Sequence, residues 1–232
     1  MNKKTFPNLN YTFNNQNVLN DLPIAISDLL FKRSTNMSFK AGAYIFEEGN
    51  APEGIYRVIS GKVKKSTLTT FGTEHIFYVC KELDYLGYHA LLSDENYSDS
   101  AAALTDCEIA FINKADFLKA VEKSHLLTQR LLKNLSHEFV VYINATKALA
   151  KYTVRERTAL NLLILEDKFG DDAGTKTSIT ITRMDLANMV GTAKESLVRM
   201  LKDFKEEALI STKGSTIFIE NHQGLFDVSN FN

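Results

Sequence analysis

The amino-acid sequence predicts an α+β protein. Short antiparallel strands come first, one long helix follows, and a compact helical module with a terminal β-hairpin ends the chain. Between about residues 37 and 113, short segments rich in β-branched and aromatic residues alternate with turn residues. From Lys114 the apolar residues recur at helical spacing, and beyond Tyr152 the helical segments become short and are separated by turns.

Composition limits the class of protein. The chain has 232 residues, a net charge of −1 and 44% apolar residues, which is typical of a globular protein. Cys80 and Cys107 are too few for a disulfide-built domain or for a four-cysteine zinc or iron–sulfur site. No apolar run reaches about 18 residues, so we expect no membrane span. We therefore expect a cytoplasmic protein with reduced thiols and no metal site.

The first region carries five predicted strands. Turn residues separate them, and Gly61 is expected to take a positive φ in a tight turn between two of them. Short strands at regular spacing favour an antiparallel sandwich or barrel. The predicted strands are Tyr44–Phe46, Gly54–Ile59, Lys62–Leu68, His75–Val79 and Glu108–Ile112.

A predicted helix from about Leu126 to Lys147 carries a long apolar stripe without Gly or Pro. At about 1.5 Å per residue, such a helix is longer than one small barrel. It either covers its own domain or pairs with its twin in a homodimer, and the resemblance of the stripe to a coiled-coil seam favours the homodimer. The residues predicted at the dimer interface are Leu127, Leu131, Leu135, Phe139, Tyr142 and Thr146, with Leu132 and Ile143 on an adjoining apolar edge.

Two helix starts after residue 180 carry the pattern of a capping box. Thr182 stands three residues before Asp185, and Thr192 stands three residues before Glu195. We expect a first helix from Thr182 to about Val190, a sharp turn at Gly191, and a second helix from Thr192 to about Glu207. Two helices joined by a short Gly-containing turn form the helix-turn-helix unit.

The second of these helices has two different faces. Leu197, Leu201, Phe204 and Ala208 are predicted to face the core, whereas Glu195, Val198, Arg199 and Lys202 point outward. Residues 194–205 hold four basic and two acidic side chains, a net charge of +2 in a protein of net charge −1. Such a face is either merely solvated or lies in the major groove of DNA, where Lys and Arg recognise guanine and Glu recognises cytosine.

The segment that follows, from Leu209 to Ile219, is predicted to form a hairpin that turns at Lys213-Gly214. A hairpin in this position is the wing of a winged helix. Together with the double capping pattern and the Gly turn, it favours DNA recognition over a solvated face. The predicted DNA-binding residues are Thr182, Arg183, Thr192, Lys194, Glu195, Ser196, Arg199, Lys202 and Lys213.

The stretch ITRMDLANMVGTAKESLVRMLKDFKEEALIS, residues 181–211, resembles the DNA-binding domain of the Crp/Fnr family of bacterial transcription regulators. FKAGAYIFEEGNAPEGIYRVISGKVK, residues 39–64, and CEIAFI, residues 107–112, resemble strands of the family's cyclic-nucleotide-binding-type β-roll. By position, Lys194 replaces a usual basic base-reading residue, while Glu195 and Arg199 match the family's Glu and Arg. The resemblance covers about residues 25–222.

The resemblance implies three parts and a function. Residues 1–124 would form a β-roll sensor domain of the jelly-roll type, residues 125–151 a dimerisation helix, and residues 152–232 a winged helix-turn-helix. The function implied is that of a homodimer that binds a palindromic site in double-stranded DNA, contacts RNA polymerase, and is gated by a small effector or binds DNA constitutively. The alternatives are a regulatory module whose main partner is not DNA and an enzyme, and the chain shows no catalytic motif.

The effector pocket departs from the family pattern. Members that bind cyclic AMP use a Gly-Glu pair and an Arg-Ser pair, but here Tyr88 replaces the Glu after Gly87, and Tyr97 replaces the Arg before Ser98. A buried phosphate without its cation is costly, so we expect no cyclic AMP binding. The pocket either holds an apolar or aromatic effector or is filled by its own side chains. The candidate pocket residues are Gly87, Tyr88, Tyr97, Ser98, Tyr142 and Ile143.

The other cofactors of the family are not expected either. Its iron–sulfur members use an N-terminal cysteine cluster, and this chain has no cysteine before Cys80. Haem-binding members use axial His or Cys ligands, but the spacing of His75 and His89 supports no such site. Cys80 and Cys107 lie in strand-like segments and are interpreted as buried, unreactive thiols.

Overall fold

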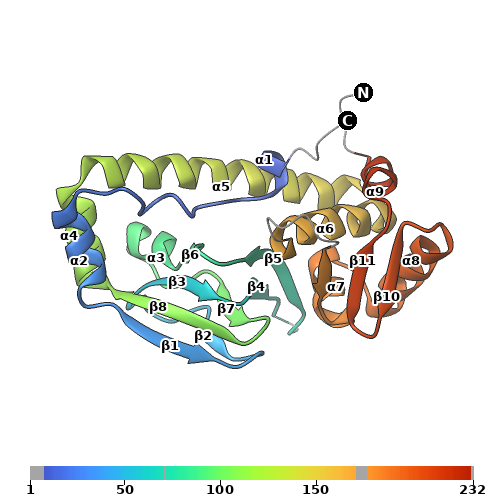
Figure 1. The fold of residues 1–232 in the computed structure, drawn as a ribbon, viewed down its shortest axis with the longest axis horizontal. Helices are drawn as coiled ribbons and strands as arrows, with labels where there is room; N and C mark the ends of the chain where they lie inside the picture. The colour runs from blue at the N-terminus through green and yellow to red at the C-terminus, as the bar shows by residue number, and fades with distance from the viewer. Residues whose placement is uncertain (1–7, 71, 171–176, 231–232) are drawn as a thin grey trace. The chain divides into compact units, whose positions relative to one another are not determined.

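The computed structural model describes residues 8–70, 72–170 and 177–230, whose secondary structure is drawn in Figure 1. The chain divides into two compact units. The first, called the β-roll unit, consists of Phe13–Phe71 and Tyr78–Phe139. The second, called the winged-helix unit, consists of Val140–Asn232 with the segments Met1–Thr12 and Gly72–Phe77.

Two four-stranded sheets are built from the strands of the first half of the chain. In these sheets β8 pairs antiparallel with β1 and β3, and β7 pairs antiparallel with β2 and β4. One sheet has the order β1 (Thr35–Phe39), β8 (Cys107–Asn113), β3 (Gly54–Ser60) and β6 (Tyr85–Leu86). The other has the order β2 (Tyr44–Phe46), β7 (Ser100–Ala103), β4 (Val63–Leu68) and β5 (Glu74–Cys80).

All five predicted strands are confirmed, each to within one residue at either end. Side chains from both sheets form a single core, in which Val58, Val63 and Ile109 have no exposed surface. Strands β1, β6 and β7 were not predicted. The residues of β1 are almost all exposed and show no alternation between buried and exposed positions. Strand β7 consists of Ser and Ala, which have little preference for strands, and it is a strand because it pairs with β2 on one side and β4 on the other.

Gly61 takes the positive φ that the sequence predicts, 91°. A Cβ at this position would lie 2.4 Å from the carbonyl oxygen of Asp106 and 2.6 Å from Sγ of Cys107. Backbone conformation and space therefore both require glycine here.

Three short helices accompany the sheets of the β-roll unit. They are α2 (Ile24–Phe31), α3 (Tyr88–Ser93) and α4 (Lys114–Lys123). Helix α3 starts directly after Gly87, whose φ of 83° turns the chain out of β6. Helix α4 is capped by Asn113, whose side chain accepts a hydrogen bond of 3.0 Å from the amide of Asp116.

The predicted long helix is confirmed as α5 (His125–Lys151), 27 residues in length. Its residues up to Phe139 belong to the β-roll unit, and the rest belong to the winged-helix unit. Leu127 and Leu131 are only 0% and 3% exposed, so they are enclosed within one chain. The assignment of these two residues to a dimer interface is therefore wrong, because an enclosed side chain has no surface left to offer a partner.

The winged-helix unit contains a three-stranded sheet of order β10-β11-β9 and a set of packed helices, of which α6 contacts α7, α8 and α9 (Figure 1). A capping box of Thr153 and Glu156 starts α6. The elements are α1 (Asn8–Tyr11), α6 (Val154–Phe169), β9 (Ser178–Thr180), α7 (Arg183–Val190), α8 (Lys194–Glu206), β10 (Ile210–Lys213), β11 (Thr216–Ile219) and α9 (His222–Val228).

Among the described residues, no helix is both long and apolar enough to cross a membrane.

Candidate DNA-binding surface and effector pocket

The helix-turn-helix is formed by α7, a three-residue turn and α8. As predicted, Thr182 caps α7: its hydroxyl oxygen accepts a 2.9 Å hydrogen bond from the amide of Asp185 and donates one of 2.6 Å to the Asp185 carboxylate. Gly191 ends α7 in the left-handed region, with φ 67°. The first half of the predicted motif is therefore confirmed.

The predicted cap at Thr192 is wrong. Helix α8 begins at Lys194, and its N-cap is Ala193, which makes no side-chain capping bond. The amides of Gly191 and Thr192 both donate to the carbonyl oxygen of Ala187, so Thr192 completes the end of α7 instead of starting α8.

Helix α8 has one buried and one exposed face, as the sequence predicts. Leu197, Leu201 and Phe204 are buried at 0%, 4% and 0% exposure. Ala208 is an exception, since it lies beyond the helix end, is exposed and has φ 56°. The predicted DNA-binding side chains of α8 are exposed, apart from half-buried Ser196, and these are Lys194, Glu195, Arg199 and Lys202.

The C-terminal end of α8 is anchored by Arg155 of α6. Its guanidinium lies 4.9 Å from the centre of the Phe204 ring, and it forms an ion pair of 2.6 Å with Glu207. The face of α8 opposite to its exposed residues is therefore fixed by apolar packing and a cation–π contact.

The predicted wing is confirmed as the hairpin of β10 and β11, with the turn at Gly214-Ser215, one residue later than expected. Lys213 is exposed beside this turn. Arg183 was predicted to bind DNA, but it is half-buried and donates to the carbonyl oxygens of Gly214 and Ser215 at 3.1 and 3.2 Å. Its role in the described structure is to hold the wing turn against the start of α7.

Aromatic rings occupy part of the predicted effector pocket in the β-roll unit. Tyr97 is 3% exposed, and its ring stacks on that of Phe46 with centroids 4.0 Å apart. Its hydroxyl donates to the carbonyl oxygen of Gly54 at 3.3 Å. A Cβ on Gly87 would lie 3.3 Å from this hydroxyl, so Gly87 and Tyr97 are close neighbours.

Beside these rings lies a buried cluster of charged and polar side chains from β4, α3, α5 and the loop before β7, which we call the Lys65 cluster. The ammonium of Lys65 on β4 lies 2.8 Å from the Asp99 carboxylate and 3.8 Å from the Glu138 carboxylate of α5. Tyr88 of α3 donates a hydrogen bond of 3.0 Å to Glu138. His89 lies 3.2 Å from Asp99.

The members of the Lys65 cluster are buried well enough to influence one another's ionisation. Lys65, Asp99 and Glu138 side chains are 6%, 5% and 14% exposed. Burial alone would raise the pKa of Asp99, but the Lys65 ammonium and the neighbouring His89 together hold it below its usual value. Burial and the nearby Glu138 carboxylate raise the pKa of Tyr88 well above its usual value, so Tyr88 stays a hydrogen-bond donor.

The structure brings together only part of the predicted pocket set. Gly87, Tyr88 and Tyr97 lie in the β-roll unit near the Lys65 cluster, but Ser98 is exposed and the following residue, Asp99, is buried instead. Tyr142 and Ile143 belong to the winged-helix unit and are 37% and 51% exposed. The ring of Tyr142 packs 5.5 Å from that of Phe77 in that unit.

Lys65 is the residue that sequence reasoning missed, and a signal for it existed. Successive side chains of a strand alternate between its two faces. Val63 is fully buried on β4, and Lys65, two residues later, therefore points to the same inner face. The family's Arg is absent from this sequence, but Lys65 places a different cation in this part of the β-roll unit.

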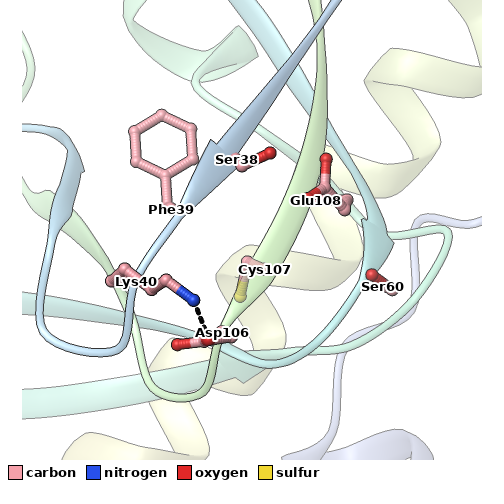
Figure 2. A pocket seen from close by; sticks show the side chains of 7 residues that line it. All are labelled: Ser38, Phe39, Lys40, Ser60, Asp106, Cys107 and Glu108. Carbon is pink, nitrogen blue, oxygen red and sulfur yellow. Dashed lines mark hydrogen bonds and ion pairs between the residues drawn. The ribbon is translucent and has the colours of Figure 1, made fainter.

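A separate hollow lies at the edge of β1 and β8 (Figure 2). It holds an exposed ion pair of 2.7 Å between Lys40 and Asp106, and Cys107 lies beside it. Cys107 is buried, and burial raises the pKa of its thiol, which confirms the prediction of a buried thiol; Cys80 is buried too. No group of three or more metal-binding side chains occurs among the residues that the structure describes.

Two protein-family models match the chain in sequence order. The cyclic nucleotide-binding domain matches residues 36–124, and the Crp-like helix-turn-helix domain matches residues 156–228. The first match includes Lys65, Tyr88 and Asp99 of the Lys65 cluster, and the second includes the entire helix-turn-helix with its wing.

Several characterised regulators are similar over most of their length. The anaerobic regulatory protein of Bacillus subtilis is 28% identical over 187 residues, which are 79% of each chain. The fumarate and nitrate reduction regulatory protein of Vibrio cholerae is 28% identical, covering 81% of this chain and 76% of its own. The CRP-like cAMP-activated global transcriptional regulator of Mycobacterium tuberculosis is 25% identical, with 88% and 91% coverage.

Solved structures share the fold. FixK2 from Bradyrhizobium japonicum superposes with a TM-score of 0.77 at 20% identity, covering 86% of this chain and 98% of its own. A transcriptional regulator from Thermus thermophilus gives a TM-score of 0.70 at 22% identity, with 85% and 99% coverage. The similar proteins are transcription regulators and not enzymes. By its two matched domains, its fold and its relatives, the chain belongs to the Crp/Fnr family of DNA-binding transcription regulators.

Proposed function

We propose that the protein regulates transcription as a homodimer that binds a palindromic DNA site without needing a cyclic nucleotide. DNA binding is supported by one observation: helix α8 has an exposed charged face, and its opposite face is buried. Lys194, Glu195 and Arg199 lie on the first two turns of α8, the part of a recognition helix that contacts base edges. Lys202 and Lys213 are placed to contact phosphate.

The homodimer is supported by the apolar side chains that α5 leaves exposed. Leu132 and Phe139 are 66% and 65% exposed, and Ile143 and Leu149 are 51% and 41% exposed. Four large apolar side chains on one helix are costly to leave in water, and pairing two copies of α5 would bury them. The proposed dimer interface also includes three further residues of the predicted stripe, Leu135, Tyr142 and Thr146.

Independence from cyclic AMP is supported by the Lys65 cluster. The single buried cation in the cluster is already paired with two carboxylates, so an entering phosphate would have to displace Asp99 or lie beside it. Either arrangement leaves a buried negative charge without compensation, which costs several kcal/mol. Tyr97 in addition fills space by stacking on Phe46.

A location and a partner follow from this function. DNA as the target implies work in the cytoplasm of a bacterial cell, and regulation of transcription implies contact with RNA polymerase. The names of the relatives differ, since one is called an anaerobic regulatory protein and another a cAMP-activated regulator, so a signal cannot be assigned to this chain by similarity.

Binding-site selection from random duplexes with the purified full chain tests the proposal. Two recognition helices related by a two-fold axis lie about 34–36 Å apart, so the selected site should be a palindrome whose half-sites are one helical turn apart. Enrichment of a single non-repeated half-site, or of no sequence, would contradict the proposal.

A further inference from the structure

Arg157 of α6 makes three hydrogen bonds that none of the roles above uses. Its guanidinium donates to the carbonyl oxygen of Val190 at 2.8 Å, of Tyr152 at 2.7 Å and of Gly191 at 3.1 Å. The side chain is half-buried, and burial lowers its pKa. An Arg side chain nevertheless remains charged in proteins, so all three bonds are charge-assisted.

The three carbonyls belong to the ends of two helices. Val190 is the last residue of α7 and Gly191 is its C-cap, whereas Tyr152 directly follows α5 and closes its last turn through a 3.0 Å bond from its amide to the carbonyl oxygen of Ala148. Carbonyls at helix C-termini lack partners within the helix and carry the negative end of the helix dipole. One guanidinium therefore satisfies the ends of α5 and α7 at the same time.

A second contact joins the same two elements. Leu149 in the last turn of α5 packs against the turn between α7 and α8, so closely that a Cβ on Gly191 would lie 3.0 Å from its Cδ2 atom. Gly191 also has φ 67°, which disfavours any other residue. The C-terminal end of α5 and the turn of the helix-turn-helix are thus held by one apolar contact and one three-way polar contact.

We propose that Arg157 is a positioning residue that fixes α8 relative to α5 and thereby sets the half-site spacing that the dimer accepts. This inference rests on the proposed function, in which α5 pairs with its copy and two α8 helices bind one palindrome. If both α5–α8 angles are fixed, the separation of the two recognition helices is fixed too. Inserting one base pair moves a half-site by about 3.4 Å and rotates it by about 34°, which a rigid hinge cannot follow.

The neighbouring Arg155 provides a matched control. It also extends from α6 and also anchors the recognition helix, through Phe204 and Glu207. Its described partners lie on α8 and at the end of α8, and neither belongs to α5. Loss of Arg155 should destabilise the packing of α8 on α6 without affecting the contacts between α5 and the turn after α7.

The experiment measures affinity of the full chain for the selected duplex and for versions with one base pair added to or removed from the spacer. Wild-type protein should bind both altered duplexes at least ~10-fold more weakly, since tenfold is only ~1.4 kcal/mol of misfit. Arg157→Ala should reduce this preference to about threefold or less, and Arg155→Ala should keep it at about tenfold while lowering all affinities.

Arg157→Lys keeps the charge and covers the case in which Arg157→Ala fails to fold. A lysine has one nitrogen in place of the planar fork, so it cannot reproduce the three bonds and should also relax the spacing preference. The inference is overturned if a folded Arg157 variant loses affinity equally on all three duplexes and keeps the wild-type preference. A wild-type protein that binds all three duplexes equally would also overturn the inference, because a rigid hinge predicts a preference for one spacing.

Discussion

The two units of this protein use charged side chains in opposite ways. In the β-roll unit, the ammonium of Lys65 points inward and pairs with the carboxylates of Asp99 and Glu138, and the three side chains are 5–14% exposed. In the winged-helix unit, Lys194, Arg199 and Lys202 are exposed on one face of α8. Buried, paired charges contribute to the fold, because each has lost its hydration and interacts with its partner instead. Charges that remain exposed are available to phosphates and bases.

This difference shows that a matched domain need not keep the residues that bind its usual ligand. The cyclic nucleotide-binding domain model matches residues 36–124, yet the sequence there has Tyr88 and Tyr97 at the positions where the resemblance leads us to expect Glu and Arg. The helix-turn-helix retains the expected Glu195 and Arg199 in exposed positions. The fold is kept in both units, but the residues that would recognise a partner are kept only in the second.

The largest expected effect is on α5, which belongs to both units. Leu132→Asp combined with Phe139→Asp should convert a dimer into monomers, because each change removes about 1.5–3 kcal/mol of apolar burial and adds a charge to the interface. The dimer dissociation constant should rise more than about 1,000-fold. Sedimentation at micromolar concentration measures this.

The control for this prediction is Lys133→Asp, a charge change at an exposed position one residue away on the same helix. It should leave the dimer intact. A wild-type chain that sediments as a monomer would refute the proposed dimer.

The next effect concerns the Lys65 cluster. Lys65→Met should lower the free energy of unfolding by about 3–5 kcal/mol, because two carboxylates remain buried without their cation. Lys65→Met with Asp99→Leu should be less destabilised than Lys65→Met alone, since one of the unpaired charges is gone. Denaturant unfolding measures both, and a loss below about 1 kcal/mol for Lys65→Met would show that the ammonium is solvated.

On α8, Arg199→Ala should weaken binding to the selected duplex by about 1–3 kcal/mol and relax discrimination at one base pair per half-site. The matched control is Lys202→Ala, which should weaken binding to all sequences alike and reduce the salt dependence by about one phosphate contact. Titrations at several salt concentrations separate the two. Equal losses on all sequences for Arg199→Ala would make it a phosphate contact.

The smallest expected effect is the pH dependence of stability that comes from Asp99. Its pKa in the folded protein is below its ordinary value of 3.8, so the ionised form is favoured by folding. The contribution is complete above pH 3.8 and is lost as the pH falls through the folded pKa. Asp99→Asn should lower stability at neutral pH and flatten this part of the acid profile, and an unchanged slope in unfolding measurements at pH 2–5 would exclude Asp99 as its source.

The helix-turn-helix could be predicted from sequence because its signals are local. Thr182, Gly191 and the spacing of Leu197 and Leu201 each act within a few residues, through capping, a positive φ and one buried face. Thr192 was misassigned because a Thr three residues before a Glu has the same pattern whether it caps α8 or completes the turn after α7. Only the backbone distinguishes the two.

The effector pocket could not be assembled from sequence because its contacts are not local. The pocket is lined by residues from four separate segments of the chain, and the sequence around each one does not indicate the other three. These residues are Lys65, Tyr88, Asp99 and Glu138. The predicted dimer interface was wrong at Leu127 and Leu131 for a related reason. Helical spacing shows which residues share a face, but not which part of that face the β-roll unit already covers.

The most direct test of the account is the effect of cyclic AMP on the affinity of purified protein for its selected duplex. Each lost charge-assisted bond, one expected from Glu and one from Arg, costs about 1.5–3 kcal/mol, and the loss of both would weaken a micromolar site to a dissociation constant between about 0.1 and 30 mM. We expect tight, sequence-specific binding in the absence of any nucleotide and no change when cyclic AMP is added. Binding that appears only with cyclic AMP, or a calorimetric dissociation constant for it below ~10 μM, would contradict the account.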